Sequence, residues 1–442
     1  MEQTRIIPPG GGGPDNRTRA MNDMGKTAMV GSVKTLDIEC IPGNRYALST
    51  GPTREHVLIQ LRSGAIATGR RLPLNLALVV DRSGSMEGEP LEYVKQACGY
   101  VVDLLEPNDT LSVITFAEQV EVLVPARRVI NKSLLKEHIN RIEVGNTTNL
   151  YDAIVAGCQQ VAATRSEGYV NRVLLLTDGD PTAGIKDFAS IVGQAAEQKS
   201  RGITLTALGF GPDYNEELMA GIARRTGGNY YYISRPELIP EVFRKELESL
   251  MTLVARNMRL RMSLSRWVQL RQVYGRQYNT PDPRHAEMGL VDMERGSAMS
   301  ILCDLEFAPH PAGIFRVAKA ELFYDDTSSG RTEVLAGDIE IEFTRDPALV
   351  QAGVNPMVQQ EFEIAQASRN LEKTIMGMKT QQISAMHATM ELQKTMSLLA
   401  SQGRMAEAAD VKNAITSIQQ GGADAEKTLI GTIYNLDQGK KK

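Results

Sequence analysis

Between residues 71 and 255, short apolar runs alternate with stretches in which apolar side chains recur every three to four positions. The apolar runs predict strands at residues 74–80, 110–116, 172–177, 204–210 and 229–233. The periodic stretches predict helices at residues 90–105, 133–142, 150–165, 187–201, 215–226 and 236–254. Strands that alternate with helices are typical of a parallel sheet covered by helices, so we expect an α/β fold with a doubly wound, mostly parallel sheet.

The segments on either side of this region change to a period of two. Apolar and polar positions alternate before it and again after it, which predicts half-exposed antiparallel strands. The strand candidates are residues 36–40, 57–61, 257–264, 268–273, 299–307, 314–324 and 339–343. The five later strands are too few for a sandwich unless the two early strands join them. We therefore predict a split antiparallel β-sandwich of residues 33–70 and 256–346, with the domain of residues 71–255 inserted between its parts.

The two ends of the chain differ from this core. Residues 347–442 have a helical pattern with breaks at Gly403 and Gly421-Gly422, which predicts an antiparallel bundle of two to four helices. Its methionines either fill the core or form an adaptable surface for a partner. The final lysines favour the end of the last helix, and otherwise form a solvated tail. Residues 1–32 are rich in Pro and Gly, and we predict a disordered N-terminal arm.

Three separated segments carry oxygen ligands at the ends of these predicted elements. Asp81, Ser83 and Ser85 follow one buried strand, Asp178 follows another, and Thr148 precedes a helix. Because ligands of an open α/β sheet bind at the carboxyl ends of its strands, we expect these side chains to converge. Their oxygens suit Mg²⁺, or Mn²⁺ or Ca²⁺, better than the metals that prefer thiols or imidazoles. Hydroxyls bound directly, and waters held by the two carboxylates, would leave one coordination position open.

These residues resemble a von Willebrand factor type A (VWA) domain, a Rossmann-like fold, with its metal-ion-dependent adhesion site. The family pattern is Asp-x-Ser-x-Ser, then a distant Thr, then a distant Asp that usually precedes Gly, and it is complete here. Residues 207–211 and 226–230 are also similar, and the resemblance spans about residues 72–250. We choose Thr148 over its neighbour Thr147 because family members usually have the liganding Thr directly before Asn.

The whole layout is similar to inter-alpha-trypsin inhibitor heavy chains, and to bacterial and plant proteins with a C-terminal VWA-interacting region. The resemblance implies a non-enzymatic adaptor or scaffold in an intracellular complex, in which the Asp or Glu carboxylate of a partner protein completes the metal coordination. It also implies work beside an AAA+ ATPase, kinase or phosphatase system. A ubiquitin-ligase role of the plant type is not supported, because the sequence has no RING-type Cys/His set. The alternative is an assembly subunit that binds through its Met-rich C-terminal helices, with the metal only structural.

Composition and the remaining motifs exclude other classes. The 442 residues carry a net charge of −4, so the chain has no overall basic field to hold nucleic acid. Its apolar runs are of strand length and its first residues lack an apolar core, so we expect neither a membrane span nor a signal peptide. The four cysteines are widely spaced, which favours buried free thiols in a cytoplasmic protein. The sequence has no HExxH, GxSxG, Walker A or CxxC motif, and we expect no enzymatic activity.

Overall fold

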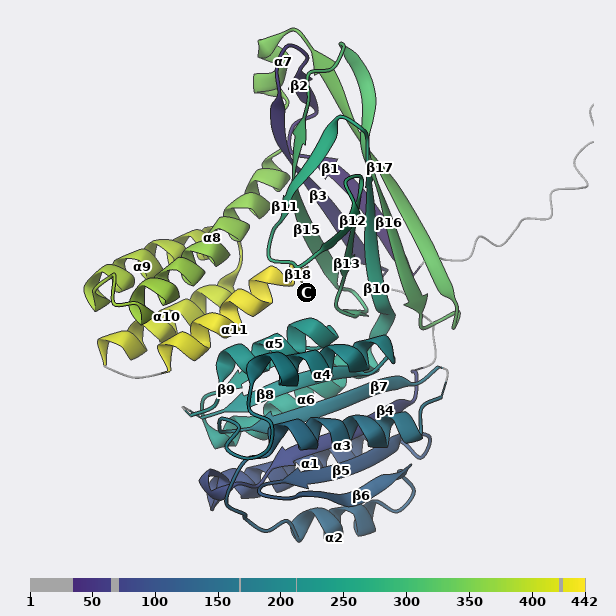
Figure 1. Ribbon diagram of the computed structural model, residues 1–442, viewed down its shortest axis with the longest axis vertical. Helices are drawn as coiled ribbons and strands as arrows, with labels where there is room; N and C mark the ends of the chain where they lie inside the picture. Colours follow the sequence, from purple (N-terminus) through teal and green to yellow (C-terminus); the bar gives the residue numbers. More distant parts are fainter. Residues whose placement is uncertain (1–34, 65–70, 167, 212, 421–423, 442) are drawn as a thin grey trace, which may run out of the picture. The chain divides into compact units, whose positions relative to one another are not determined.

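A six-stranded sheet with helices on both faces forms the α/β region (Figure 1). The computed structural model describes residues 35–64, 71–166, 168–211, 213–420 and 424–441. In the order β6-β5-β4-β7-β8-β9, all neighbours are parallel except β6 and β5. The strands are β4 (Leu74–Asp81), β5 (Thr110–Phe116), β6 (Val120–Arg128), β7 (Val170–Thr177), β8 (Thr204–Phe210) and β9 (Tyr230–Ile233).

Helices cover both faces of this sheet, which confirms the doubly wound arrangement. One face packs against α1, α2 and α6, and the other against α3, α4 and α5. The helices are α1 (Glu89–Leu104), α2 (Lys132–Asn140), α3 (Leu150–Ala163), α4 (Phe188–Ser200), α5 (Glu216–Thr226) and α6 (Ile239–Met251), with short 3₁₀ turns η1 (Gly84–Met86) and η2 (Pro236–Leu238). Several of them begin at a side chain that accepts a backbone N–H of the first turn, namely Asn131, Asn149, Asp187 and Asn215.

The split β-sandwich is also confirmed, because early and late strands share a sheet. The early strand β3 pairs along its length with the late strand β15, in the order β1-β3-β15-β11. The second sheet has the order β12-β13-β10-β16-β17-β2, with β14 beside β10. The bounds are β1 (Leu36–Pro42), β2 (Tyr46–Leu48), β3 (Thr53–Ser63), β10 (Leu253–Leu264), β11 (Val268–Val273), β12 (Asn279–Asp282), β13 (His285–Gly289), β14 (Met293–Glu294), β15 (Ala298–Phe307), β16 (Gly313–Asp326) and β17 (Thr332–Thr344).

Three details of the predicted strands and helices are wrong. The helix predicted to reach residue 254 ends at Met251, and β10 begins at Leu253 because its first residues pair with β14 and β16. Asn257, with φ of +50°, lies at the bulge that hides this early part from a period-two pattern. The strands β2, β6, β12, β13 and β14 were not predicted. β2, β6 and β12 lie at sheet edges and β14 has only two residues, whereas β13 pairs on both sides and has buried positions only at Ala286 and Met288.

The C-terminal region is helical as predicted. Its helices are α7 (Pro347–Ala352), α8 (Pro356–Lys379), α9 (Ala385–Ser401), α10 (Met405–Gln419) and α11 (Ala425–Asp437). The helices α8 to α11 share one hydrophobic core, which agrees with the predicted two to four helices. The short helix α7 lies outside this core and packs on β2 and β17. The predicted break between helices at Gly403, where φ is +75°, is confirmed. The predicted break at Gly421-Gly422 and the predicted disordered arm of residues 1–32 lie outside the described residues.

The prediction of a solvated lysine tail is wrong for Lys440 and Lys441. They form a short strand, β18 (Lys440–Lys441), that pairs with β15. The Lys440 ammonium lies 3.0 Å from a Glu294 carboxylate oxygen, and Lys441 pairs with Glu361 of α8. Both of these glutamates are buried, so the lysines neutralise charges that would otherwise be costly to bury.

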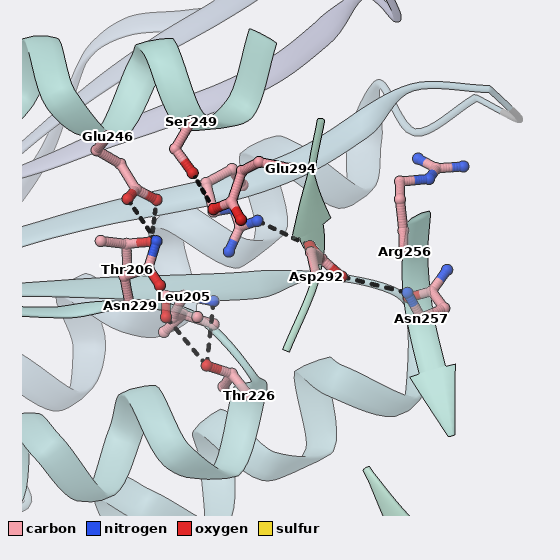
Figure 2. A network of polar contacts seen from close by, with 12 residues as sticks. Leu205, Thr206, Thr226, Asn229, Glu246, Ser249, Arg256, Asn257, Asp292 and Glu294 are labelled. Carbon is pink, nitrogen blue, oxygen red and sulfur yellow. Dashed lines mark hydrogen bonds and ion pairs between the residues drawn. The ribbon is translucent and has the colours of Figure 1, made fainter. Parts of the chain in front are cut away.

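A polar network joins the α/β region to the sandwich. Arg172 of β7 donates to Asp292 at 2.9 Å. In Figure 2 the same carboxylate accepts the backbone N–H of Asn257, and Ser249 of α6 donates to Glu294. Residues Thr35–Lys442 group as one compact unit, so the domain limits given above stay predictions. Within the described residues, no helix is both long enough and apolar enough to cross a membrane.

Candidate metal site

Asp81 is the last residue of β4 and lies at the carboxyl edge of the sheet. Its carboxylate is fully buried, and both oxygens accept hydrogen bonds. The backbone N–H of Ser83 donates to Oδ1 at 2.8 Å, and the Thr177 hydroxyl donates to Oδ2 at 2.5 Å. Asp81 is therefore held in one orientation between two neighbouring strand ends.

Asp178 follows β7 and meets the serines of the β4 loop. The Ser85 hydroxyl donates to its Oδ1 at 2.8 Å, and the Ser83 hydroxyl lies 3.4 Å from the same oxygen. The two serine hydroxyls are 3.2 Å apart. Ser83 and Asp178 are buried whereas Ser85 is exposed, so this cluster opens to solvent on the side of Ser85.

Thr148 lies in the loop before α3. This loop packs against the loop after β4 and against the segment that contains Asp178. Gly145 donates to the Arg82 carbonyl at 2.6 Å, which fixes this loop beside the one after β4. A β-carbon on Gly179 would lie 3.7 Å from the Thr148 hydroxyl, so that hydroxyl lies next to the Asp178 segment. The structure thus brings together the loops of all five residues predicted from the sequence, and the metal site itself stays a prediction.

Two further threonines support the site. Thr182 receives the backbone N–H of Thr148 on its hydroxyl at 2.8 Å, and its own N–H donates to the Thr148 carbonyl at 3.0 Å. Thr177, next to the predicted ligand Asp178, orients Asp81. The sequence predicts Thr177 at this edge, because it ends its strand next to Asp178, whereas no local pattern points to Thr182.

The neighbouring Thr147 has a buried hydroxyl without a hydrogen-bond partner in the described part of the chain. Such an atom normally finds a partner when it is removed from water. Because the Thr148 hydroxyl faces Gly179, our choice between the two threonines remains Thr148.

Burial leaves the two carboxylates of the site poorly compensated. It raises the pKa of Asp81 to about 6, and the nearby charge of Asp178 adds to this increase. It also raises the pKa of Asp178, and the charge of Asp213 contributes. A divalent cation would relieve both effects, so the electrostatics fit a bound metal.

The donor chemistry fits a hard cation. Among the described residues, no three His, Cys, Asp or Glu side chains are arranged to hold a metal, so thiol or imidazole coordination has no candidate there. The cluster instead offers two carboxylates and hydroxyls from Ser83, Ser85 and Thr148, the oxygen donors that Mg²⁺, Mn²⁺ and Ca²⁺ accept.

The sequence around this site matches a known protein-family model. Residues 75–245 match the model described as "von Willebrand factor type A domain". The chain contains a VWA domain. VWA domains commonly act as metal-dependent protein–protein interaction modules, and the resemblance to inter-alpha-trypsin inhibitor heavy chains and bacterial VWA proteins is confirmed.

Relatives of this chain include bacterial and human proteins. It is 28% identical over 316 residues to an uncharacterized protein of Synechocystis sp., an alignment that covers 69% of this chain and 74% of that protein. It is 28% identical to the uncharacterized protein YfbK of Escherichia coli, covering 62% of this chain and 50% of YfbK. Human inter-alpha-trypsin inhibitor heavy chain H4 is 32% identical over 36% of this chain, which spans only 18% of that relative.

Solved structures share the fold well beyond the VWA domain. A von Willebrand factor type A protein from Catenulispora acidiphila superposes with a TM-score of 0.72 and 16% identity, covering 86% of this chain and 89% of the other. The ArnB paralog VWA2 from Sulfolobus acidocaldarius gives 0.61 and 18%, covering 91% and 98%. At these identities the likeness concerns the fold alone.

Proposed function

We propose that this chain is a non-enzymatic, Mg²⁺-dependent protein-interaction module that acts as an adaptor or scaffold in a cytoplasmic complex. The observation that carries the proposal is the gathering of Ser83 and Ser85 against Asp178, with Asp81 locked behind them, on a side open to solvent. A bound cation would supply a Lewis-acidic position that takes a carboxylate oxygen from a partner's Asp or Glu.

The chain's own residues divide the work of holding that cation. The hydroxyls of Ser83, Ser85 and Thr148 would contact it directly. Asp81 would act through water, because both of its oxygens already accept hydrogen bonds. With few anionic contacts, the cation would keep enough electrophilic character to favour an incoming carboxylate.

Free thiols support the cytoplasmic part of the proposal. The structure leaves all four cysteines unpaired, three of them buried. Burial raises the pKa of Cys98 to about 12, which keeps that thiol protonated and unreactive. Persistent free thiols are typical of a reducing compartment.

Calorimetric titration with MgCl₂ tests the metal site. We expect saturable binding to the intact chain and none to the double variant Ser83→Ala with Ser85→Ala. Ser397→Ala, which removes an exposed hydroxyl bonded only to its own helix, is the matched control and should bind as the wild type does. Equal binding by the double variant would show that these serines hold no metal.

Partner capture tests the interaction. The immobilised chain should retain a partner from native lysate in Mg²⁺, and lose it in EDTA or when both serines are replaced. A screen for phosphatase and nucleotide turnover tests the absence of catalysis. Metal-dependent turnover that disappears in Asp81→Ala would overturn the non-enzymatic assignment.

A second candidate function is assembly through the C-terminal helices. Four methionines of this region are strongly exposed: Met376, Met386, Met390 and Met405, at 61%, 78%, 50% and 66%. Exposed flexible thioethers suit adaptable contacts with a partner. Deleting the helices would also uncover α5 and β9, against which α11 packs, so the better test is Met386→Gln with Met390→Gln. Partner capture that survives EDTA and fails in this variant would favour assembly.

A further inference from the structure

A cleft of about 450 Å³ lies at the amino edge of the VWA sheet, opposite the candidate metal site. It is bounded by the ends of α4 and α5, by β13 and the segment between β11 and β12, and by α8 and α11. A volume of this size is typical of sites for small molecules. Its lining includes four basic side chains, Lys199, Arg224, Arg225 and Arg276, so its chemistry points to an anion.

Lys199, in the last turn of α4, lies in this cleft without a counter-ion. Its side chain is partly buried, and it has neither an ion pair nor a hydrogen bond within the residues that the structure describes. Its ammonium lies so close to Gly227, where φ is +75°, that a β-carbon there would clash with it. Asp292 attracts this ammonium but already pairs with Arg172 at 2.9 Å. Burial accordingly lowers the pKa of Lys199.

Two of the acids in the lining are already paired with arginines. Asp437 of α11 pairs with Arg224 at 3.3 Å, and Glu287 of β13 pairs with Arg261 at 2.7 Å. These pairings limit how strongly either carboxylate opposes an anion in the cleft. They also leave neither carboxylate free to balance the other cations there.

The remaining charges of the lining are mostly positive. Among the described residues, Arg225 and Arg276 form no ion pair, and neither does the acid Glu372. Arg276 donates to the Gln438 carbonyl, and burial lowers its pKa to about 10. Together with Lys199, three cations and one carboxylate are therefore left without an oppositely charged partner. A doubly charged anion would neutralise this excess.

Helix ends explain only part of this pattern. Cations in the last turn of a helix favour its dipole, which accounts for the exposed Arg225 of α5. Arg276 lies on no helix, because it follows β11 and precedes β12. Lys199 does end a helix, but it is partly buried, where an ammonium without a partner is costly. A bound anion would account for both Lys199 and Arg276.

We propose that this cleft binds a phosphate group, either free phosphate or the phosphate monoester of a small metabolite. A phosphate monoester carries between about 1.5 and 2 negative charges at pH 7 and accepts hydrogen bonds from ammonium and guanidinium groups. Lys199 and Arg276 would donate to it, and Arg225 would add positive charge. The cleft is larger than a phosphate group needs, and Tyr278 of its lining offers a ring for an organic part to pack on. None of these residues belongs to the candidate metal site, so the inference goes beyond the proposed function.

Calorimetric titration of the full chain with glycerol 3-phosphate, and separately with inorganic phosphate, tests the site. EDTA in the buffer removes metal ions, so that neither probe binds through the candidate metal site. We expect saturable binding that weakens at least about tenfold in Lys199→Met, the loss of one hydrogen bond to a charged group. Lys373→Met is the matched control, because Lys373 is exposed and follows Glu372 in the chain but does not line the cleft. Its affinity should stay within about twofold of wild type, since an exposed charge is screened.

Thermal denaturation separates ligand binding from a structural role. Lys199→Met removes an ammonium that has no partner, so its melting temperature without phosphate should equal or exceed that of wild type. A lower melting temperature would show that Lys199 holds the fold, and would count against the inference. Phosphate should stabilise wild type and Lys373→Met more than Lys199→Met, which keeps only the general stabilising effect of the salt. Arg225→Gln changes an exposed side chain, should weaken binding in the same direction, and serves if Lys199→Met fails to fold.

The outcomes are distinct. Tighter binding of glycerol 3-phosphate than of inorganic phosphate assigns the cleft to a monoester, whereas equal or tighter binding of inorganic phosphate assigns it to the free ion. No binding of either probe overturns the inference, and so does wild-type affinity in both Lys199→Met and Arg225→Gln. Succinate that binds as tightly as the phosphates would also overturn it, because any doubly charged anion would then suffice.

Discussion

Replacing Arg172 by Met should weaken the contact between the VWA domain and the sandwich and so lower the stability of the protein. Arg172 is 3% exposed and Asp292 9%, and their N–O distance is 2.9 Å. The variant removes the cation and leaves the Asp292 carboxylate buried, with only the backbone N–H of Asn257 as a remaining hydrogen-bond donor among the contacts in the described residues. The loss should therefore appear as instability at the junction shown in Figure 2.

The magnitude follows from burial and distance. At 2.9 Å and an effective dielectric constant of about 20, the direct attraction is about 6 kcal/mol. Most of this only offsets the desolvation of both charges, and removing one partner of a buried pair typically costs about 3–5 kcal/mol. Because Asp292 keeps the hydrogen bond from Asn257, we expect about 3 kcal/mol.

A double-mutant cycle isolates this interaction. Arg172→Met and Asp292→Asn should each destabilise the protein, and the double variant should lose much less than their sum, with a coupling energy of at least about 2 kcal/mol. Differential scanning calorimetry is the appropriate assay, because a chain with several cores need not unfold in one step. The matched control is the exposed pair Arg244 and Glu248, also at 2.9 Å, for which coupling should be about 0.5 kcal/mol or less.

Equal coupling in the two pairs would refute this reasoning. It would show that burial at the junction does not strengthen the ion pair, and that the remaining contacts of Asp292 suffice to hold its charge. A large coupling at the junction with a small one on the surface would confirm that the two regions are joined through this contact.

Three further predictions concern single positions. Gly209→Ala should lower the free energy of unfolding by about 1–3 kcal/mol, because the buried Tyr214 ring lies 2.1 Å from the added β-carbon. Gly193→Ala, whose added β-carbon has nothing within 4 Å, should raise the free energy of unfolding by up to about 1 kcal/mol. Thermal denaturation checks both variants, and equal effects would contradict the packing argument. Burial raises the pKa of Glu55 from 4.5 to about 7, so its stabilising contribution is present below pH 4.5 and lost as the pH rises through 7; Glu55→Gln should therefore raise the melting temperature at pH 8 and leave it unchanged near pH 4, and a difference that does not vary with pH would refute this cause. Val79→Asp places an unpaired charge in a fully buried position of the central strand and should abolish folding of the VWA domain, so a soluble variant with native circular dichroism and melting temperature would contradict the assignment of β4 to the core.

The sequence predicted the parts of the fold that a local pattern specifies. The strands at residues 110–116, 204–210 and 268–273 have the predicted bounds, and in the first two, apolar and β-branched residues fill most positions. Strand β6 escaped prediction because most of its positions are partly or fully exposed and Pro125 interrupts it. Its place in the sheet depends on pairing with β5 and not on a hydrophobic pattern of its own.

Part of the candidate site was also predictable from the sequence, and part was not. The residue types and their places after strands or before a helix were readable, because parallel strands direct their carboxyl ends to one edge. The support from Thr182, which clamps the Thr148 backbone, was not readable, because those residues meet only after the loops have packed.

The sequence by itself determined the spacing of apolar positions in each segment and the carboxylate and hydroxyl side chains of the three loops. Only the tertiary structure decided which distant segments meet: β3 beside β15, Lys440 on Glu294, and Lys427 on the Tyr214 carbonyl. The physical reason is that periodicity records which face of an element is buried, but not what buries it. The partner of each face is settled by long-range packing and by the pairing of buried charges, and neither leaves a local pattern in the chain.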